Sequence, residues 1–313
     1  MTDLSFGLPP NVTGTVVTIG TFDGVHKGHR GVLSEISSRA RPPGLASLLV
    51  TFEPHPMEIV NPQAAPPLLT LAEERREILA QCDLDYAVFL KFTASMSQQS
   101  PKEFISYLIE KFSMKELVMG HDHGLGRGRT GDVATLRELG SSLGFSVDIV
   151  SAVEEGGRPV SSTLIRREIA GGNLAAAEKQ LGRRYSLTGM VVGGDGRGRT
   201  IGYPTLNIAM PDHRKLLPPD GVYAVIVESP LGSFAGMMHQ GPRPTFDDDT
   251  RSVEVHLLDF NGDLYGAKVK VSWVAYIRGV RTFASPEQLK AQLDNDLDDA
   301  ENALTEYRSQ ASH

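Results

Sequence analysis

The chain has 313 residues, of which 40% are hydrophobic and 22% charged, and its formal net charge is −7. This length allows one to three domains with cores of their own, and the negative charge argues against a general nucleic-acid or anionic-membrane binder. The single cysteine, Cys82, excludes a disulfide framework and a cysteine metal cluster. Because no apolar run approaches about 18 residues and no signal-peptide pattern opens the sequence, we expect a cytoplasmic protein without a membrane segment.

The first half of the chain alternates apolar, strand-like runs with helical patterns. A helix is predicted over Pro101–Phe112, where Ser100 and Glu103 form a capping box and large apolar residues recur every four positions. Such alternation predicts an α/β domain with a parallel sheet that binds ligands at the carboxyl ends of its strands. The expected strands are Gly14–Ile19, Ala46–Phe52, Tyr86–Phe92, Glu116–Met119 and Ser146–Ser151.

Beyond about residue 185 short strands follow one another, separated by Gly, Pro and Asp clusters. They predict a mostly antiparallel barrel or sandwich, followed by a C-terminal helix that begins near Ser285 and carries an apolar stripe. A helix that ends at Leu181 precedes this change, so we expect domains at 1–184 and 185–313. The expected strands are Ser186–Val192, Val222–Glu228, Ser233–Met238, Val253–Phe260 and Lys268–Val274.

The first predicted strand runs into GTFDGVHKGH, residues 20–29, and then into an amphipathic helix. Glycines at a strand end let the backbone approach a ligand, and a helix N-terminus attracts phosphate. We therefore expect a ligand with phosphate groups at this strand end, where His26 and His29 can donate hydrogen bonds to phosphoryl oxygens. Two histidines three apart are also compatible with zinc, although no carboxylate stands at zinc-protease spacing.

Three later segments have the chemistry to complete this site. TFEPHP, residues 51–56, places His55 after the second strand, and residues 120–131 form a basic, glycine-rich loop that contains Asp122. His121 and His123 in that loop are compatible with a metal or with solvated side chains. Finally, SSTLIR opens a helix, where the residues at its start form either an anion cradle or a simple cap; these are Ser162, Thr163 and Arg166.

In the second half, the run GDGRGRTIGYPTLN spans residues 194–207. Its glycines leave backbone N–H groups accessible to an anion, and Thr205 and Asn207 offer neutral oxygen ligands of the kind that Mg²⁺ accepts beside phosphates. The run matches neither the Walker nor the dinucleotide-binding spacing, so a plain turn between strands stays open. The glycines expected to approach the phosphate groups of a ligand are Gly194, Gly196 and Gly198.

A strand further along the chain carries a candidate base. Alternation places Glu254 and His256 on one face, while Val253, Val255 and Leu257 form a core face. Glu254 is therefore either a surface residue of a half-exposed strand or a general base directed at a ligand.

Taken together, these motifs resemble the HxGH nucleotidyltransferase superfamily and, over the whole chain, the bacterial bifunctional riboflavin kinase/FAD synthetase family. The resemblance implies an HxGH-type Rossmann-like domain that makes FAD from FMN and ATP, with His26 and His29 stabilising the transition state and Asp122 and His55 in the nucleotide–flavin pocket. The residues that it implies for ATP and its phosphates are Gly20, Phe22, Asp23, Ser162, Thr163 and Arg166. It also implies a riboflavin kinase domain that uses Glu254 as base and Thr205 and Asn207 for Mg²⁺ and ATP. The implied ligands are ATP, riboflavin, FMN, FAD and Mg²⁺, with no nucleic acid and at most a weak homo-oligomer.

The chain departs from this family's usual pattern at a few positions. His123 and Leu125 replace aromatic residues, and His239-Gln240-Gly241 stands where Asn-Ile-Gly is common. Two other functions remain open at this point: a kinase whose HxGH domain adenylylates another phosphate compound, and a flavin-binding protein without activity.

Overall fold

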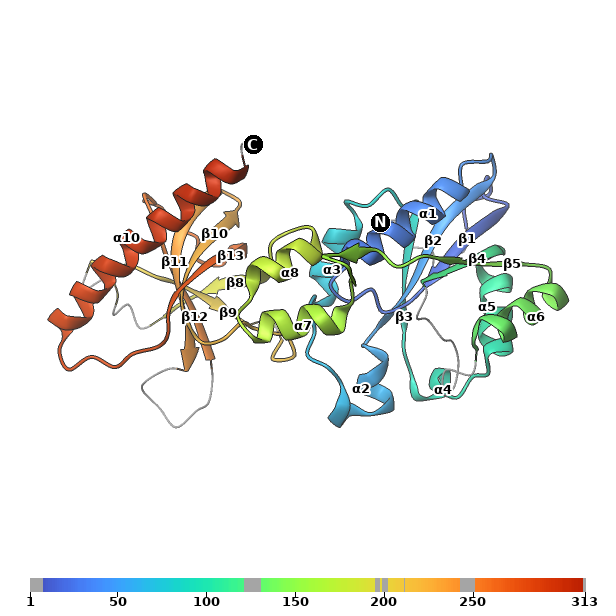
Figure 1. The fold of residues 1–313 in the computed structure, drawn as a ribbon, viewed down its shortest axis with the longest axis horizontal. Coiled ribbons are helices and arrows are strands. Elements are labelled where there is room, and N and C mark those ends of the chain that lie inside the picture. Colours follow the sequence, from blue (N-terminus) through green and yellow to red (C-terminus); the bar gives the residue numbers. More distant parts are fainter. Residues whose placement is uncertain are drawn as a thin grey trace. The chain divides into compact units, whose positions relative to one another are not determined.

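The computed structural model describes residues 8–120, 131–194, 198, 202–210, 212–242 and 251–311. The chain forms two compact units, Met1–Leu164 and Ile165–His313, each of which is described by itself. Figure 1 shows a sheet flanked by helices in the first unit and a barrel in the second. Among the helices of the described ranges, none has the length and apolarity needed to cross a membrane.

A five-stranded parallel sheet organises the first unit, as the sequence predicted. Its order is β3-β2-β1-β4-β5, so the chain moves from β1 outward to β3 and then returns to pair β4 against β1. This order places the topological switch point between β1 and β4, where α/β proteins bind ligands. The strands are β1 (Gly14–Ile19), β2 (Leu45–Glu53), β3 (Tyr86–Lys91), β4 (Met114–Gly120) and β5 (Ser146–Val150).

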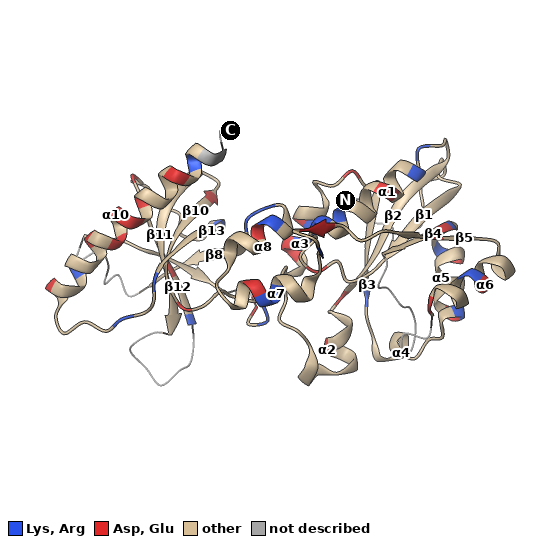
Figure 2. Ribbon diagram, in the orientation of Figure 1, with Lys and Arg blue, Asp and Glu red and all other residues tan. Residues whose placement is uncertain are grey.

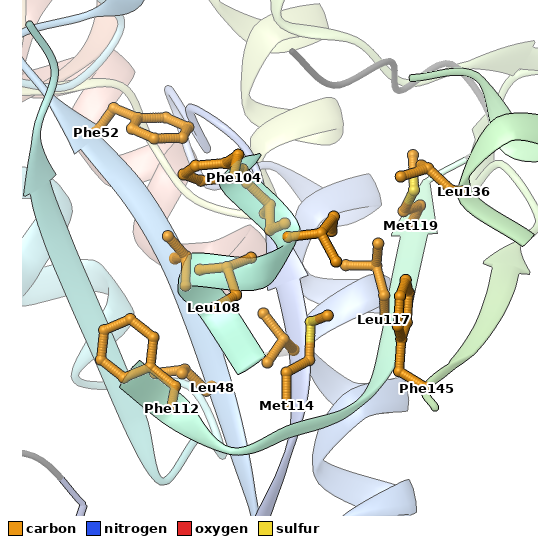
Figure 3. Packing of buried hydrophobic residues seen from close by; sticks show 14 residues of the cluster. Leu48, Phe52, Phe104, Leu108, Phe112, Met114, Leu117, Met119, Leu136 and Phe145 are labelled. Carbon is orange, nitrogen blue, oxygen red and sulfur yellow. The ribbon is translucent and has the colours of Figure 1, made fainter. Parts of the chain in front are cut away.

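Helices cover both faces of this sheet because its strands are buried on both sides. Val16 of β1 packs in one cluster with residues of α1, whereas its neighbour Val17 packs in another with residues of α5. Figure 3 shows the second cluster, in which Phe104 and Leu108 of α5 lie over Leu48 and Phe52 of β2. The helices are α1 (Lys27–Arg39), α2 (Pro56–Val60), α3 (Ala72–Leu79), α4 (Ala94–Ser97), α5 (Pro101–Phe112) and α6 (Val133–Leu143).

Local sequence signals set the ends of several elements. The predicted capping box at α5 is present: the Ser100 hydroxyl accepts from the Glu103 amide, and the Glu103 carboxylate accepts from the Ser100 amide. The helices α2, α3, α4 and α6 were not predicted, and neither was the short hairpin β6 (Glu154–Glu155) with β7 (Arg158–Pro159). Between α2 and α3 the chain forms one 3₁₀ turn, Pro62–Ala64.

The second unit is a closed antiparallel barrel, which confirms the barrel over the sandwich. Its strand order is β10-β11-β12-β9-β8-β13. The helices α7 (Ser162–Ala170) and α8 (Leu174–Leu181) lie between sheet and barrel in the sequence. The strands are β8 (Ser186–Val192), β9 (Leu206–Ala209), β10 (Gly221–Ser229), β11 (Gly232–Pro242), β12 (Arg251–Leu257) and β13 (Lys268–Arg278).

Two differences from the expected strands matter for the site. β9, which was not predicted, carries Asn207 into the sheet. β12 ends at Leu257 rather than at Phe260, because Asp259 has a left-handed backbone with φ 52°, a conformation that extended strands do not contain.

The C-terminal helix α10 (Pro286–Ala311) packs along the outside of the barrel, as its apolar stripe predicted (Figure 1). Leu293, Leu297, Ala300 and Leu304 lie in one cluster with residues of β10 and β11. Acidic residues recur along the helix (Figure 2), and Asp294, Asp298 and Asp299 are exposed. This surface repels anions, so phosphate contacts in this unit must come from elsewhere.

Candidate functional sites

The segment between β1 and α1 has an unusual backbone. Phe22, Gly24 and Val25 have φ values of 47°, 84° and 38°, and the Val25 amide donates to the Phe22 carbonyl at 3.1 Å. A β-branched or aromatic residue rarely adopts this left-handed region, and such outliers concentrate at functional sites. Tertiary contacts must therefore hold the loop in this form.

Asp23 supplies those contacts from inside the protein. Its carboxylate is fully buried and accepts hydrogen bonds from the Leu69 amide at 2.9 Å, the Thr70 amide at 2.8 Å and the Thr70 hydroxyl at 3.0 Å. The Thr70 hydroxyl also accepts from the Gly24 amide at 3.0 Å. These contacts give Asp23 a part in fixing the loop, while its predicted contact with ATP stays a prediction.

The two histidines of the motif lie side by side. The rings of His26 and His29 stack with centroids 3.6 Å apart and 15° between their planes, and Phe22 packs on His29 with centroids 4.5 Å apart. His26 is the N-cap of α1, and its Nδ1 accepts from the His29 amide at 3.2 Å. An Nδ1 that accepts leaves the imidazole proton on Nε2, which can donate to a ligand.

Gly28, between the histidines, allows this stacking. A Cβ at this position would lie 3.1 Å from two atoms of the His26 ring, a distance that forces the ring to move. The motif therefore has a steric reason: of the two residues between the histidines, Lys27 and Gly28, the second has no side chain that would displace the His26 ring.

His55 repeats this arrangement at the next strand. It follows β2 as the N-cap of α2, it is 9% exposed, and its Nδ1 accepts from the Met57 amide at 3.2 Å. Since β1 and β2 are parallel neighbours, both histidine-capped turns lie at the same edge of the sheet. Asp122, predicted in the loop after β4, lies outside the described residues.

The start of α7 contacts the histidine loop directly. The Ser162 hydroxyl donates to the Asp23 carbonyl at 2.9 Å, whereas the neighbouring Ser161 caps the helix by accepting from the Leu164 amide at 3.3 Å. Ser161 is therefore the residue that caps α7. The hydrogen bond of Ser162 instead connects the start of α7 to the loop between β1 and α1, two segments of the predicted phosphate site. Thr163 is exposed, and Arg166 lies on the next turn of α7, in the second compact unit.

In the barrel, one row of cross-strand neighbours contains the predicted base and a predicted metal ligand. Glu254 of β12 is paired with Asn207 of β9 on one side and with His239 of β11 on the other. Directly paired residues of an antiparallel sheet point to the same face and have Cβ atoms about 4.5–5.5 Å apart. This is the outer face, because Val253 and Val255 are buried in the barrel while Glu254 is half-buried.

The glycine-rich run packs against this row. A Cβ on Gly194 would lie 2.0 Å from Nδ2 of Asn207, and a Cβ on Gly198 would lie 2.1 Å from the Tyr203 carbonyl oxygen and 3.5 Å from the Thr205 hydroxyl. Both positions therefore require glycine for the observed approach. Gly196, and the arginines at 197 and 199, lie outside the described residues.

Two ionisable side chains that the sequence did not single out as catalytic lie beside β12: His239 is paired with Glu254, and the Tyr203 ring contacts that of His256. Burial is the main cause that lowers the pKa of His239, and Arg278 adds to it, while Glu254 and Asp220 oppose the shift. The Tyr203 hydroxyl donates to Asp294, and burial together with that bond raises the pKa of Tyr203 to about 12. Tyr203 therefore stays neutral. Its hydrogen bond to Asp294 connects the segment before β9 to α10.

The structure thus brings the predicted kinase residues together. Of the predicted adenylylation residues, it brings only some together. Asn207, Glu254 and Gly194 lie in one region, and Thr205 is next to Gly198. The histidine pair is linked to Ser162 through the loop at Asp23. Sequence reasoning missed His239 as a neighbour of Glu254 and the buried Arg75 near β1; only strand register and tertiary contacts reveal either one.

Comparisons with known proteins cover both units. A family model described as FAD synthetase matches residues 8–164, and one described as riboflavin kinase matches residues 181–304. Proteins named bifunctional riboflavin kinase/FMN adenylyltransferase are similar along most of their length. The protein of Escherichia coli K12 is 40% identical over 288 residues, 90% of each chain, and that of Pseudomonas fluorescens is 36% identical over 292 residues, 93% of each.

Similarity extends to a more distant relative and to a solved structure. The Bacillus subtilis protein of the same name is 33% identical over 291 residues, 91% of each chain. A crystal structure from Streptococcus pneumoniae, described as a macrolide-efflux protein, superposes with a TM-score of 0.83 at 33% identity and covers 95% of this chain and 96% of its own. Both family models and the curated relatives agree on two reactions, one for each half of the chain.

Proposed function

The chain belongs to the family of bifunctional riboflavin kinase/FMN adenylyltransferases, and from this premise we propose which residues carry each reaction. The enzyme phosphorylates riboflavin to FMN and transfers an adenylyl group to FMN to give FAD. We assign adenylylation to residues 1–184 and phosphorylation to residues 185–313. ATP serves as the donor in both reactions.

The pairing of Glu254 with Asn207 is the observation that carries the kinase assignment. Glu254 accepts the proton of the ribityl 5′-hydroxyl while that oxygen attacks the γ-phosphorus of ATP and ADP leaves. A positioned base of this kind contributes about 10²–10⁴-fold to the rate. Nothing in the barrel core requires a carboxylate at this position, since the core-facing side of β12 is made by Val253 and Val255.

The residues beside Glu254 are suited to Mg²⁺ with ATP. Thr205 and Asn207 provide neutral oxygen atoms, and the absent Cβ of Gly194 leaves room for the Asn207 amide. No group of three or more His, Cys, Asp or Glu residues in the described ranges is arranged to hold a metal by itself. This agrees with Mg²⁺, which takes one or two protein ligands and completes its shell with water and substrate phosphates. When bound, the ion would neutralise charge on the phosphates.

In the first unit, the stacked histidines at the N-terminus of α1 carry the assignment. The FMN phosphate oxygen attacks the α-phosphorus of ATP, and the bond to the β-phosphate oxygen breaks to release pyrophosphate. His26 and His29 donate hydrogen bonds to the oxygens on which charge develops, and the helix N-terminus supports the same charge. Gly20, Phe22, Ser162, Thr163 and Arg166 hold the nucleotide, and Asp122 and His55 contact the flavin side.

Two variants test this division in one assay, in which flavins are separated by chromatography. Glu254→Gln is expected to lose FMN formation from riboflavin yet make FAD from supplied FMN at the wild-type rate. A Glu254→Gln protein with full kinase activity would remove Glu254 from its assigned role.

The reverse is expected of His29→Ala, which keeps the kinase and loses adenylylation. If FAD formation from FMN continues at the wild-type rate in this variant, His29 does not belong to the catalytic residues. Each variant retains the activity of the unit that it leaves unchanged, so the lost activity is assigned to the unit that carries the substitution.

A further inference from the structure

Arg75, on α3, is a buried cation at the ligand-binding edge of the sheet. It is 2% exposed, and the sequence around it, Glu-Glu-Arg-Arg-Glu, gives no sign of burial. Its Nη1 donates to the Thr21 carbonyl at 2.9 Å, and its Nη2 donates to the Phe52 carbonyl at 2.9 Å and to the Glu53 carboxylate at 2.8 Å. One guanidinium therefore joins the carboxyl ends of β1 and β2.

These two strand ends lead into the two histidine-capped turns. Thr21 directly precedes Phe22, whose ring packs on His29, and Phe52 lies three residues before His55. The Thr51 hydroxyl also donates to the Thr21 carbonyl at 3.0 Å, so this single oxygen accepts from β2 and from α3. The distance between the two turns thus depends on contacts that converge on one carbonyl.

Burial of a cation is costly, and it is tolerated where the charge is both paired and hydrogen-bonded. Glu53 provides the opposite charge, while the two carbonyls use the planar fork of the guanidinium, which a lysine ammonium does not reproduce. Both Arg75 and the adjacent Arg76 lie over the Phe89 ring, 5.3 and 4.2 Å from its centroid, but Arg76 is exposed whereas Arg75 is buried. Two neighbouring arginines of α3 therefore have different environments, and only the first reaches the site.

We propose that Arg75 is a positioning residue for adenylyl transfer: it fixes the β1 turn that carries His26 and His29 against the β2 turn that carries His55. This inference rests on the proposed role of the histidine pair. It predicts that the loss of Arg75 slows the chemical step, because reacting groups that are displaced by about 1 Å lose on the order of 10²-fold in rate. Substrate binding, which uses many other contacts, changes less.

The test compares Arg75→Lys and Arg75→Ala with Arg76→Ala in the full-length enzyme. A circular dichroism spectrum equal to that of the wild type is the folding control for the first unit, and riboflavin kinase activity is the control for the barrel. We expect kcat for FAD formation from FMN to fall at least tenfold in both Arg75 variants, with KM for FMN and ATP within about threefold of wild type. The kinase rate of all three variants stays at the wild-type value, and so does kcat for FAD formation in Arg76→Ala. Added guanidinium ion raises kcat of Arg75→Ala but leaves Arg76→Ala unchanged.

Wild-type kcat in the Arg75 variants overturns the inference, and so does a loss that appears only as a higher KM. Failure of guanidinium to raise kcat of Arg75→Ala has the same consequence, because a positioning role requires that the missing group can be replaced. His29→Ala is measured in parallel. If His29→Ala retains adenylylation, the proposed function fails. If His29→Ala loses adenylylation while Arg75→Lys keeps the wild-type kcat, only the role of Arg75 is overturned.

Discussion

Glu254 and Asn207 stand directly opposite each other on β12 and β9, joined by the hydrogen-bond ladder of the barrel. The spacing between the proposed base and the proposed magnesium ligand is therefore set by strand register and not by a loop. Sites built on strands hold their groups more exactly than sites on loops. Gly194, at the start of the glycine-rich run before β9, is required for space beside Asn207, because a Cβ there would overlap the Asn207 side chain.

Gly194→Ala is expected to damage the kinase selectively. Its Cβ would lie 2.0 Å from the Asn207 amide nitrogen, so the side chain must leave its place. We expect the rate of FMN formation to fall by about 10²-fold, the cost of a displacement of about 1 Å, while adenylylation stays unchanged.

Gly193→Ala is the matched control for this experiment. A Cβ on Gly193 would lie 3.5 Å from the Tyr265 ring, an ordinary contact, so its kinase rate should stay near wild type. Equal activities in the two alanine variants would contradict the requirement for space beside Asn207.

Ser162→Ala and Ser161→Ala separate catalysis from capping at α7. Ser162 bonds to the Asp23 carbonyl in the histidine loop, whereas Ser161 bonds to the first turn of its own helix. We expect Ser162→Ala to lower kcat of adenylylation about tenfold, equivalent to about 1.4 kcal/mol. Ser161→Ala should instead lower the free energy of unfolding by about 1 kcal/mol with little change in kcat. Steady-state kinetics and urea denaturation distinguish these outcomes, and the reverse pattern would exchange the two roles.

His239 is expected to make the stability of the barrel depend on pH. Its pKa is lowered from 6.5 in the folded state, mainly by burial and in part by Arg278, against the opposing charges of Glu254 and Asp220. The unfolded chain therefore binds the proton more tightly, and the free energy of unfolding falls as the pH drops below about 6.5 and rises as the pH increases through this window.

Replacement by asparagine removes this contribution. In urea denaturation from about pH 5 to pH 8, His239→Asn should show a shallower pH dependence than wild type below about pH 6.5. His213, whose side chain is 95% exposed, provides the control, because His213→Asn changes no buried group. If His239→Asn follows the wild-type curve throughout, burial of this imidazole has no measurable effect on stability.

The ion pair between Arg278 and Asp296 fixes α10 to the barrel. Arg278 Nη2 lies 2.6 Å from Asp296 Oδ2, and the side chains are 11% and 1% exposed. Asp296→Asn leaves a buried cation without its counter-charge, so we expect it to lower the free energy of unfolding by about 3–5 kcal/mol. Asp299→Asn, on the exposed side of α10, should change it by no more than about 0.5 kcal/mol. Similar denaturation midpoints for the two variants would show that the pair does not hold the helix.

Much of the fold was predictable because local signals agree with tertiary structure. The Ser100 capping box defined α5, and the alternation around Glu254 identified both faces of β12. These patterns depend on residues that are neighbours in the sequence, and such patterns do not require knowledge of the rest of the protein.

Other features depend on distant partners and were therefore missed. β9 has four residues after a glycine- and proline-rich run, and pairing with β8 and β12 makes it a strand. Arg75 belongs to a charged sequence typical of a surface helix, yet it is buried, and its guanidinium donates hydrogen bonds to the carbonyls of Thr21 and Phe52. His239 was recognised as a departure from the family pattern, but its place beside Glu254 follows only from the register of β11 and β12.

The most direct test of two separate sites combines two variants, each of which lacks one of the two activities. Glu254→Gln and His29→Ala are each incubated with riboflavin, ATP and Mg²⁺, alone and as an equimolar mixture, and FMN and FAD are measured by chromatography. The account predicts that Glu254→Gln alone makes no FMN or FAD, that His29→Ala alone stops at FMN, and that the mixture makes FAD. FAD formation from riboflavin by either variant alone at the wild-type rate would contradict it.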